Sequence, residues 1–311
     1  MPLFDEYHKP GKRGYLIGIG GVSMAPLAEV LLGEGLIITG TDMQRSEKVE
    51  ELERMGIHVN IGHRAENITE DVDFVVRTAA VRDDNPEIQA AHAMGIPVFE
   101  RTQAWGTIMK DYRNALCIAG THGKTTTTSM CTHILMAAEK DPTVMIGGTL
   151  PLLHAGHRVG QGDTIVMESC EYYDSFLSFY PTIAVILDVE ADHLDYFKDL
   201  DAVKASFRKF ASLVPENGTV VVNADDPVAM DTVKGLERDI VTFGLSEGAD
   251  VRAVNIVSSG AQSEFDVTWR GELFAHLNIQ VPGIHNVKNA LAATASAILL
   301  GVSPTAVTYG L

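Results

Sequence analysis

The sequence predicts an α/β protein with two successive parallel-sheet domains, the second of which ends in a small antiparallel meander. Strand-like and helix-like segments alternate over residues 15–98, and a second strand, loop and helix begin at Asn114. Beyond residue 239 the helices give way to three short strands. Alternation of this kind is typical of a parallel sheet covered by helices, whereas strands that follow one another directly pair antiparallel.

The first domain, expected over residues 1–107, opens with an apolar strand at residues 15–19. A glycine turn follows, and Ser23 is the expected cap of a helix that runs to Glu34. A second strand ends beside Asp42. The later elements are a charged helix at 46–55, strands near Val59 and at 74–76, a helix at 86–94 and a strand at 96–98.

The second domain is expected over residues 108–311. It begins with a strand at 115–119, a glycine-rich loop and a helix at 125–139. Further strands are expected at 164–167, 183–187 and 219–222, and the meander at 251–257, 264–269 and 273–280. Arg270-Gly271 is expected to form a tight turn, and an alanine-rich helix closes the domain at 286–300.

Composition excludes several classes of protein. The 311 residues carry a formal charge of −17, with 41 acidic and 24 basic side chains, whereas a general nucleic-acid binder needs a basic surface. The apolar runs are only as long as strands, and the N-terminus lacks a signal peptide's apolar stretch, so we expect a cytoplasmic protein that does not contact membranes. The three cysteines (Cys117, Cys131, Cys170) have no metal-like spacing and are expected to be buried and reduced.

A glycine-rich loop between the strand at 115–119 and the helix at 125–139 predicts a phosphate site. Glycines let the backbone wrap an anion, and the helix N-terminus offers unpaired N–H groups. Lys124 would contact the β- and γ-phosphates of a nucleotide, and the Thr125 hydroxyl would bind Mg²⁺. The loop is of a short kind, with two residues between its glycines: Gly120-Thr121-His122-Gly123-Lys124-Thr125-Thr126.

Three later segments carry side chains that suit a nucleotide site. Glu168 ends a strand, where a carboxylate beside a phosphate loop can hold Mg²⁺. His193 lies among carboxylates in the sequence. The neighbouring residues are equally consistent with an exposed histidine that titrates and with a metal ligand. Asn286 and Asn289 begin the last helix, where their carboxamides would either pair with adenine or serve as a helix cap and a solvent-facing side chain.

A second glycine-rich turn, Gly18 to Met24, resembles a dinucleotide-binding fingerprint of the Rossmann type. Asp42 follows at about the spacing of a ribose-binding acid. Taken alone this pattern predicts NAD, but Ser23 stands where the third glycine belongs. A turn of this kind binds other diphosphates by the same physics of a helix N-terminus.

The residues Ala119 to Thr128 resemble the ATP loop of the Mur ligases, which build the peptide of bacterial cell-wall precursors. Segments at Gly18, Glu168, His193 and His285 agree in order, so the resemblance covers essentially the whole chain. It implies an ATP-dependent carboxylate–amine ligase. Lys124, Glu168 and His193 would be catalytic, Thr125, Glu168 and His193 would hold two Mg²⁺ ions, and Asn286 and Asn289 would bind the ATP base.

The resemblance also changes the expected ligand of the first domain from NAD to a UDP-sugar. The residues implied are Gly18, Gly20, Gly21, Val22, Ser23, Met24, Asp42, Thr78 and Ala79. His63 and Arg77 lie in segments that can approach the same ligand. Two positions depart from the family: Asp188 stands where Asn is common, and Arg208 stands near the place of a carbamylated lysine, so neither receives a role.

The chain looks most like the alanine-adding branch of the family. The implied reaction transfers the γ-phosphoryl group of ATP to the lactyl carboxylate of UDP-N-acetylmuramate, and the amine of L-alanine then attacks the acyl phosphate. The alternatives are the family's tripeptide-recycling branch and, from another class, an NAD-dependent oxidoreductase. Because the family's carboxy-terminal amino-acid-binding domain is not found before Leu311, we expect the chain to bind nucleotides without ligating.

Overall fold

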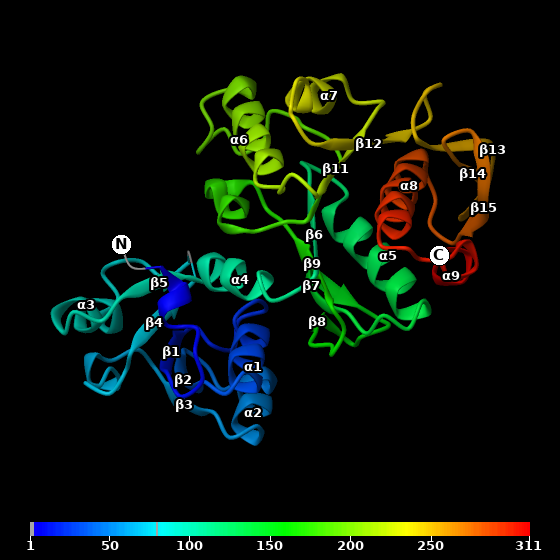
Figure 1. Cartoon of the computed structure of the whole chain (residues 1–311). Coiled ribbons are helices and arrows are strands. Elements are labelled where there is room, and N and C mark those ends of the chain that lie inside the picture. The colour runs from blue at the N-terminus through cyan, green and yellow to red at the C-terminus, as the bar shows by residue number, and fades with distance from the viewer. Residues whose placement is uncertain (1–2, 79) are drawn as a thin grey trace. The chain divides into compact units, whose positions relative to one another are not determined.

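The computed structural model describes residues 3–78 and 80–311, which fold into two compact units (Figure 1). The first unit ends at Asp111 and the second begins at Tyr112. The expected boundary at residue 107 falls inside helix α4 (Arg101–Met109). The chain therefore completes this helix, which packs within the first unit, before it enters the second.

The first unit is built on a five-stranded sheet in the order β3-β2-β1-β4-β5, and all of its strand pairs are parallel. Helices α1 and α2 lie on one side of this sheet and α3 on the other (Figure 1). The strands are β1 (Arg13–Ile17), β2 (Ile37–Asp42), β3 (His58–Ile61), β4 (Phe74–Arg77) and β5 (Val98–Glu100). The helices are η1 (Phe4–Glu6), α1 (Ala25–Gly33), α2 (Glu47–Arg54), η2 (Ala65–Asn67), α3 (Pro86–Ala93) and α4.

The second unit is built on a ten-stranded sheet in the order β15-β14-β13-β12-β11-β10-β6-β9-β7-β8. Its central strands are parallel, and the antiparallel strands lie at its two ends. The strands are β6 (Asn114–Ala119), β7 (Thr143–Leu150), β8 (Ala155–Arg158), β9 (Thr164–Glu168), β10 (Ile183–Ile186), β11 (Thr219–Asn223), β12 (Asp239–Gly244), β13 (Val251–Ser259), β14 (Gln262–Trp269) and β15 (Glu272–Ile279).

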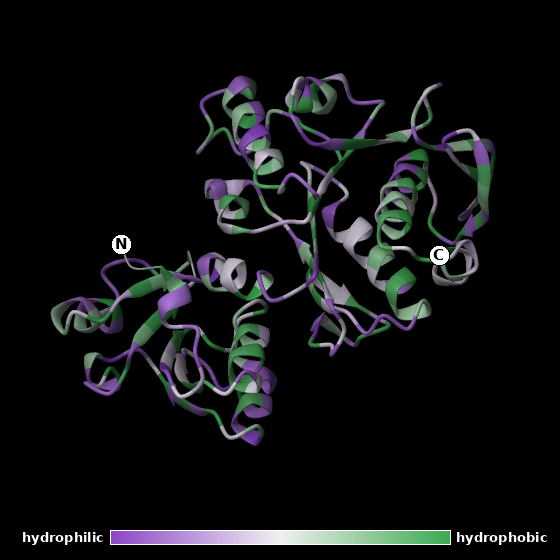
Figure 2. Cartoon of the chain, in the orientation of Figure 1, coloured by the Kyte–Doolittle hydropathy of each residue, from purple (hydrophilic) through white to green (hydrophobic). Residues whose placement is uncertain are grey.

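Helices cover both faces of the larger sheet. Helix α5 (Lys124–Ala137) packs against α8 (Ile284–Leu299) and α9 (Pro304–Gly310), while α6 (Leu200–Ser212) packs against α7 (Pro227–Val233) and the short helix η3 (Tyr172–Ser178). In α6 the buried residues Val203, Phe207 and Phe210 recur at helical spacing. Figure 2 shows the matching mixture of hydrophilic and hydrophobic residues along this helix.

The antiparallel meander occurs as expected, and β12 and β13 pair in parallel and join it to the central sheet. Two features differ from expectation. Strands β7 and β8 were not predicted. The first helix begins at Ala25 without a side-chain cap, and the Ser23 hydroxyl instead accepts a hydrogen bond from Arg101.

Candidate functional site

The phosphate loop connects the C-terminal end of β6 to the N-terminus of α5, at the centre of the ten-stranded sheet. Gly123 has a φ of 80°, and a Cβ atom there would lie 2.6 Å from Asn289 Oδ1. Gly120 has a φ of 153°, and a Cβ atom there would lie 2.8 Å from the Cβ of Leu187. Only glycine fits both positions, so the loop sequence and the neighbouring elements determine its shape together.

The ammonium of Lys124 is folded back onto the loop. Its Nζ donates to the carbonyl oxygens of Gly120 at 2.5 Å and Thr121 at 3.1 Å. It also lies 3.2 and 3.4 Å from the two carboxylate oxygens of Glu171. Lys124 thus lies at the start of α5, and its phosphate-binding role stays a prediction. Glu171 is a partner of Lys124 that the sequence did not indicate.

Thr125, in the first turn of α5, donates from Oγ1 to Glu168 Oε1 at 2.9 Å. The other carboxylate oxygen, Oε2, accepts the backbone N–H of Gly147 on β7 at 2.6 Å. Because β9 lies between β6 and β7, its last residue, Glu168, meets both neighbours. Two of the three predicted metal ligands are thus in direct contact.

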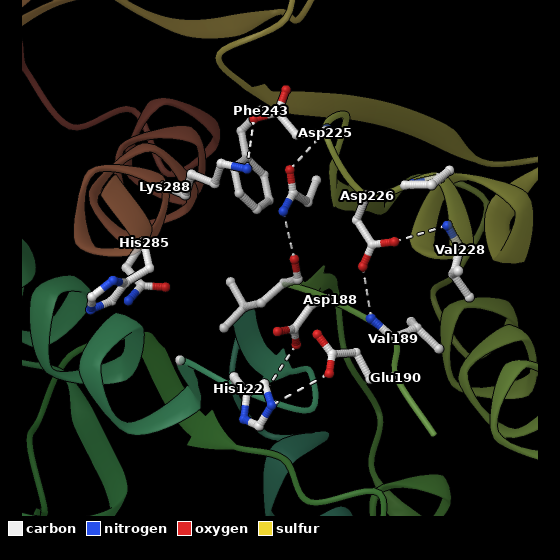
Figure 3. A pocket seen from close by; sticks show the side chains of 15 residues that line it. His122, Asp188, Val189, Glu190, Asp225, Asp226, Val228, Phe243, His285 and Lys288 are labelled. Carbon is white, nitrogen blue, oxygen red and sulfur yellow. Dashed lines mark hydrogen bonds and ion pairs between the residues drawn. The ribbon is translucent and has the colours of Figure 1, made fainter. Parts of the chain in front are cut away.

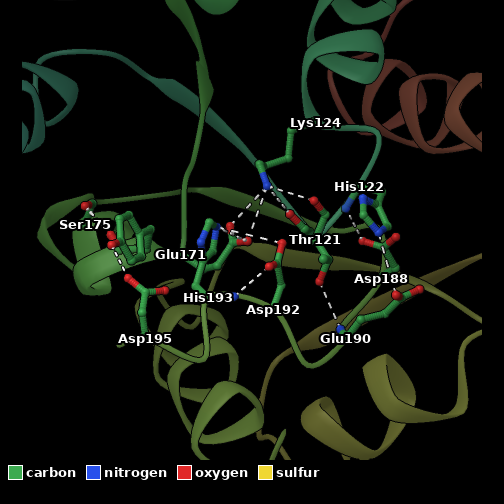
Figure 4. A network of polar contacts seen from close by, with 12 residues as sticks. Thr121, His122, Lys124, Glu171, Ser175, Asp188, Glu190, Asp192, His193 and Asp195 are labelled. Atoms are coloured by element: carbon green, nitrogen blue, oxygen red, sulfur yellow. Dashed lines mark hydrogen bonds and ion pairs between the residues drawn. The ribbon is translucent and has the colours of Figure 1, made fainter. Parts of the chain in front are cut away.

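His193 approaches Glu171 rather than Glu168. Its Nε2 lies 3.7 Å from Glu171 Oε1 and 4.0 Å from Asp192 Oδ2. The imidazole stacks on the ring of Tyr172, with centroids 4.4 Å apart. Figure 4 shows Lys124 and His193 converging on Glu171 from two sides.

Asp188, whose role the sequence left open, fastens the loop. Its Oδ1 accepts the backbone N–H of His122 at 2.8 Å, and its carbonyl oxygen accepts the N–H of Thr121 at 3.3 Å. Burial raises the pKa of Asp188, while the hydrogen bond from His122 opposes that shift. The Thr121 hydroxyl in turn accepts the N–H of Glu190 at 2.9 Å. An amide side chain at position 188 would offer the same acceptor oxygen, which explains why Asp can replace Asn here.

A cavity of about 670 Å³ opens beside the loop (Figure 3). Its volume is in the range of sites that bind small molecules. Asn289 lines the cavity, whereas Asn286 is not among the lining residues and donates to the carbonyl oxygen of Pro282 at 2.7 Å. His285 and Lys288 line it too, and the sequence analysis did not assign them. The lining residues are His122, Gly123, Leu187, Asp188, Val189, Glu190, Asn223, Asp225, Asp226, Pro227, Val228, Phe243, His285, Lys288 and Asn289.

Helical spacing groups the lining residues of α8. Residues 285, 288 and 289 share one face of α8, because side chains three and four positions apart are neighbours on a helix. Asn286 is also three positions from Asn289, and its Oδ1 accepts a hydrogen bond from the Asn289 carboxamide at 3.2 Å, but it does not line the cavity. The periodicity of the motif could have identified His285 and Lys288 from the sequence.

The amino-terminal glycine turn follows β1. The N–H groups of Gly18 and Ile19 donate to the carbonyl oxygen of Thr41 at 2.8 and 2.9 Å, and the Gly21 N–H donates to the Gly18 carbonyl oxygen at 3.0 Å. The carboxylate of Asp42 accepts the N–H of Gly20 at 2.9 Å. Asp42, which has the sequence spacing of a ribose-binding acid, therefore stabilises the glycine turn through its side chain.

The other predicted residues of this turn differ in exposure. Val22 is 63% exposed, whereas the side chain of Met24 is fully buried in the core of the unit. Thr78 accepts the N–H of Val81 at its carbonyl oxygen, and Ala79 lies outside the described residues.

The two further candidates near this turn are engaged with other side chains. His63 Nδ1 contacts the buried carboxylate of Glu87 at 2.7 Å. Arg77 Nε donates to Glu100 at 2.8 Å.

The donors around the loop fit magnesium by type, since Mg²⁺ prefers oxygen ligands such as the Thr125 hydroxyl and the Glu168 carboxylate. Their direct hydrogen bond places the two oxygens 2.9 Å apart. The three predicted ligands do not all meet. Thr125 contacts Glu168, whereas His193 lies beside Glu171 and Asp192. Among the described residues, the group of His, Asp and Glu whose ligand atoms lie within 4.8 Å of one another is His8, Glu34 and Asp111 of the first unit.

The cysteines differ from expectation at one position. Cys117 and Cys131 are buried, and burial raises the pKa of each thiol to about 12. Cys170, between Glu168 and Glu171, is exposed.

Within the described part of the chain, no helix combines the length and the apolar character needed to cross a membrane.

Comparison with known proteins matches both units. Residues 118–297 match the Mur ligase middle domain, and residues 14–113 match the domain described as Mur ligase family, catalytic domain. A UDP-N-acetylmuramate–L-alanine ligase of Caldanaerobacter subterraneus subsp. tengcongensis is 50% identical over 94% of this chain and 63% of its own length. The corresponding Clostridium novyi enzyme is 43% identical over 99% of this chain and 67% of its own length. The chain thus spans about two thirds of the length of these relatives.

Solved structures agree in fold. The UDP-N-acetylmuramate-alanine ligase of Thermotoga maritima has a TM-score of 0.79 at 30% identity, covering 96% of this chain and 67% of that one. A UDP-N-acetylmuramate:L-alanyl-γ-D-glutamyl-meso-diaminopimelate ligase from Neisseria meningitides has a TM-score of 0.85 at 28% identity, covering 97% of both chains.

Proposed function

Because this chain belongs to the Mur ligase family, we propose that its second unit binds ATP with magnesium and its first unit binds UDP-N-acetylmuramate, for the addition of L-alanine. The observation that carries this proposal is the arrangement around the phosphate loop. Lys124, the N-terminus of α5 and the Thr125–Glu168 pair lie beside a cavity of about 670 Å³. A nucleotide in that cavity would direct its phosphates toward the loop.

Each part of the site has a definite task in this reaction. We assign the adenosine to the cavity, against Asn289 and Phe243, because the cavity adjoins Gly123. The N–H groups at the start of α5 and the ammonium of Lys124 would hold the β- and γ-phosphates. Magnesium, which Thr125, Glu168 and His193 would hold, supplies positive charge to the transferred phosphoryl group.

The reaction is a phosphoryl transfer followed by an acyl transfer. An oxygen of the lactyl carboxylate attacks the γ-phosphorus, the bond to the bridging oxygen breaks, and ADP leaves. The amine nitrogen of L-alanine then attacks the acyl carbon, loses a proton, and inorganic phosphate leaves with the transferred oxygen. Neither step needs a nucleophilic side chain, so catalysis depends on positioning and on neutralisation of charge.

Binding measurements on the 311-residue chain test the proposal. Calorimetric titration is expected to give separate binding of ATP with Mg²⁺ and of UDP-N-acetylmuramate. Lys124→Ala is expected to weaken ATP binding at least about tenfold, because a charge-assisted contact is lost, and to leave UDP-N-acetylmuramate binding unchanged. Tight NADH binding with no binding of ATP would contradict the proposal and favour an oxidoreductase.

Addition of a tripeptide to the same UDP-sugar is the second candidate, favoured by the TM-score of 0.85 to the Neisseria ligase. Alanine is preferred because the more similar relatives in sequence, at 50% and 43% identity, are L-alanine ligases. Because the 311-residue chain is expected to bind nucleotides without ligating, the assay uses this chain joined to the family's amino-acid-binding domain. Amine-dependent release of phosphate, measured in parallel with L-alanine and with L-alanyl-γ-D-glutamyl-meso-diaminopimelate, then separates the two candidates.

A further inference from the structure

Glu171 is a carboxylate that the proposed reaction does not use. It directly precedes η3, and its side chain is only 2% exposed. Both of its carboxylate oxygens face the Lys124 ammonium, at 3.2 and 3.4 Å, and Oε1 lies 3.7 Å from His193 Nε2. Glu171 therefore contacts Lys124 and His193, two of the residues to which the proposed function gives a task (Figure 4).

The ammonium of Lys124 is fully occupied in this arrangement. It has three hydrogens to donate, and it contacts two loop carbonyl oxygens as well as Glu171. Phosphate oxygens can reach the ammonium only by displacing some of these partners. Glu171 is the only one of the three groups with a full negative charge, and it occupies the place that a phosphate would take.

Backbone hydrogen bonds and aromatic packing hold the segment that carries Glu171 beside Lys124. The residue before it, Cys170, accepts the N–H of Phe176 at its carbonyl oxygen, and Phe176 is buried and stacked on Phe210 with ring centroids 4.5 Å apart. The carbonyl oxygen of Glu171 accepts the N–H of Asp174, whose φ of 54° closes the turn tightly. The backbone that carries the carboxylate is thus anchored to the hydrophobic core.

A buried carboxylate beside a phosphate site discriminates between forms of a nucleotide. Metal-free ATP would take the ammonium of Lys124 and leave Glu171 buried, unpaired and next to further negative charge, which is costly. ATP that arrives with a divalent cation brings positive charge to the same place. His193, on the other side of Glu171, is placed to remain its neighbour when Lys124 turns to the phosphates.

We propose that Glu171 is a positioning residue that holds the Lys124 ammonium while no nucleotide is bound and makes this site select the magnesium complex of ATP over metal-free ATP. This inference rests on the proposed function, because it requires that the loop bind ATP. It assigns Glu171 no contact with the reacting atoms.

The test compares two dissociation constants in the full chain, for ATP with excess Mg²⁺ and for ATP in EDTA. In Glu171→Gln the ratio of the metal-free to the magnesium constant is expected to fall at least about fivefold, the effect of roughly 1 kcal/mol of like-charge repulsion. Metal-free ATP should bind more tightly than to the unmodified chain, since Lys124 loses its competing anion. Glu216→Gln, which removes an exposed negative charge elsewhere in the same unit, is the matched control and should leave the ratio unchanged.

A purely structural role for Glu171 predicts a different result. Loss of structure would weaken both dissociation constants together and lower the melting temperature, and such a parallel loss, or an unchanged ratio, would overturn the proposal. Glu171→Asp keeps the charge and is expected to keep the selectivity.

Measurements on the unmodified chain remain decisive if the Gln variant does not fold. Equal affinity for ATP with and without Mg²⁺ there would refute the role of Glu171. Failure of the unmodified chain to bind ATP in either form would instead refute the proposed function.

Discussion

Lys288 Nζ lies 3.0 Å from Asp225 Oδ2 and joins helix α8 to the turn after β11 at the wall of the cavity beside the glycine-rich loop. The same carboxylate accepts the N–H groups of Leu245 and Ser246, each at 2.9 Å. One partly buried side chain therefore links three segments that are far apart in the sequence. Asp225 and Lys288 both line the cavity.

The pH dependence of stability should reveal this link. Burial raises the pKa of Asp225, but hydrogen bonds from Ser246, Leu245 and Lys288 prevail and lower it to about 2. Because the folded-state pKa is below the unfolded value, the contribution is fully present above about pH 4 and is lost as pH falls toward 2. Asp225→Asn is expected to lower the free energy of unfolding by about 2 kcal/mol at pH 7 and by less at pH 3, measured by urea denaturation. Asp239→Asn, at an exposed residue of β12, should change little at either pH.

Gly123→Ala tests the geometry of the phosphate loop. An alanine Cβ would lie 2.6 Å from Asn289 Oδ1 in a backbone with a φ of 80°. We expect ATP binding to weaken at least about tenfold, because the loop must open to relieve the clash. Gly248→Ala is the control, since its φ is 92° and nothing lies within 4 Å of its added Cβ. Both variants should lose a similar backbone stability in thermal unfolding, and equal ATP affinity in the two would argue against the assigned loop role.

The variant Glu168→Gln distinguishes the role proposed for Glu168 from the role proposed for Glu171. Glu168 contacts Thr125, whereas Glu171 contacts Lys124. If Glu168 holds magnesium, its amide variant should weaken ATP binding in Mg²⁺ about tenfold or more and leave metal-free ATP binding nearly unchanged. Calorimetry of both nucleotide forms provides the measurement, and a rise in metal-free affinity like that expected for Glu171→Gln would contradict the distinction.

Thiol labelling tests the placement of the cysteines. Cys170 is exposed, while Cys117 and Cys131 are buried. Iodoacetamide followed by mass spectrometry should therefore modify Cys170 in the native chain, and the other two only in urea. ATP with Mg²⁺ is expected to slow the reaction at Cys170, because it lies between Glu168 and Glu171. Labelling of Cys131 in the folded chain would show that α5 is not packed against α8 as described.

The sequence predicted those elements whose signals are local. The strand before Gly120, the helix after Gly123, the strand that ends at Glu168 and the meander all occur close to their expected positions. Glycines at a strand end, apolar runs of strand length and helical periodicity each act within a few residues. Strands β7 and β8 escaped prediction, because β7 contains two glycines and neither strand shows a clear alternation.

These local signals could not predict which side chains Glu168 and Glu171 contact. Glu168 and Glu171 stand in one motif, yet Glu168 meets Thr125 and Gly147, and Glu171 meets Lys124 and His193. Strand order decides this, because β9 lies between β6 and β7 and its last residue reaches both neighbours. Asn286 and Asn289 were equivalent candidates until the packing of α8 turned only Asn289 toward the loop.

The sequence by itself determined that a glycine-rich loop connects a strand to a helix in this chain, because the backbone freedom of Gly120 and Gly123 is a local property. Only the tertiary structure decided which carboxylate faces Lys124, how Asp188 fastens the loop and which side chains form the cavity. These contacts join segments that lie far apart along the chain, so they depend on the order of the strands and on the hydrophobic packing that fixes the helices against them.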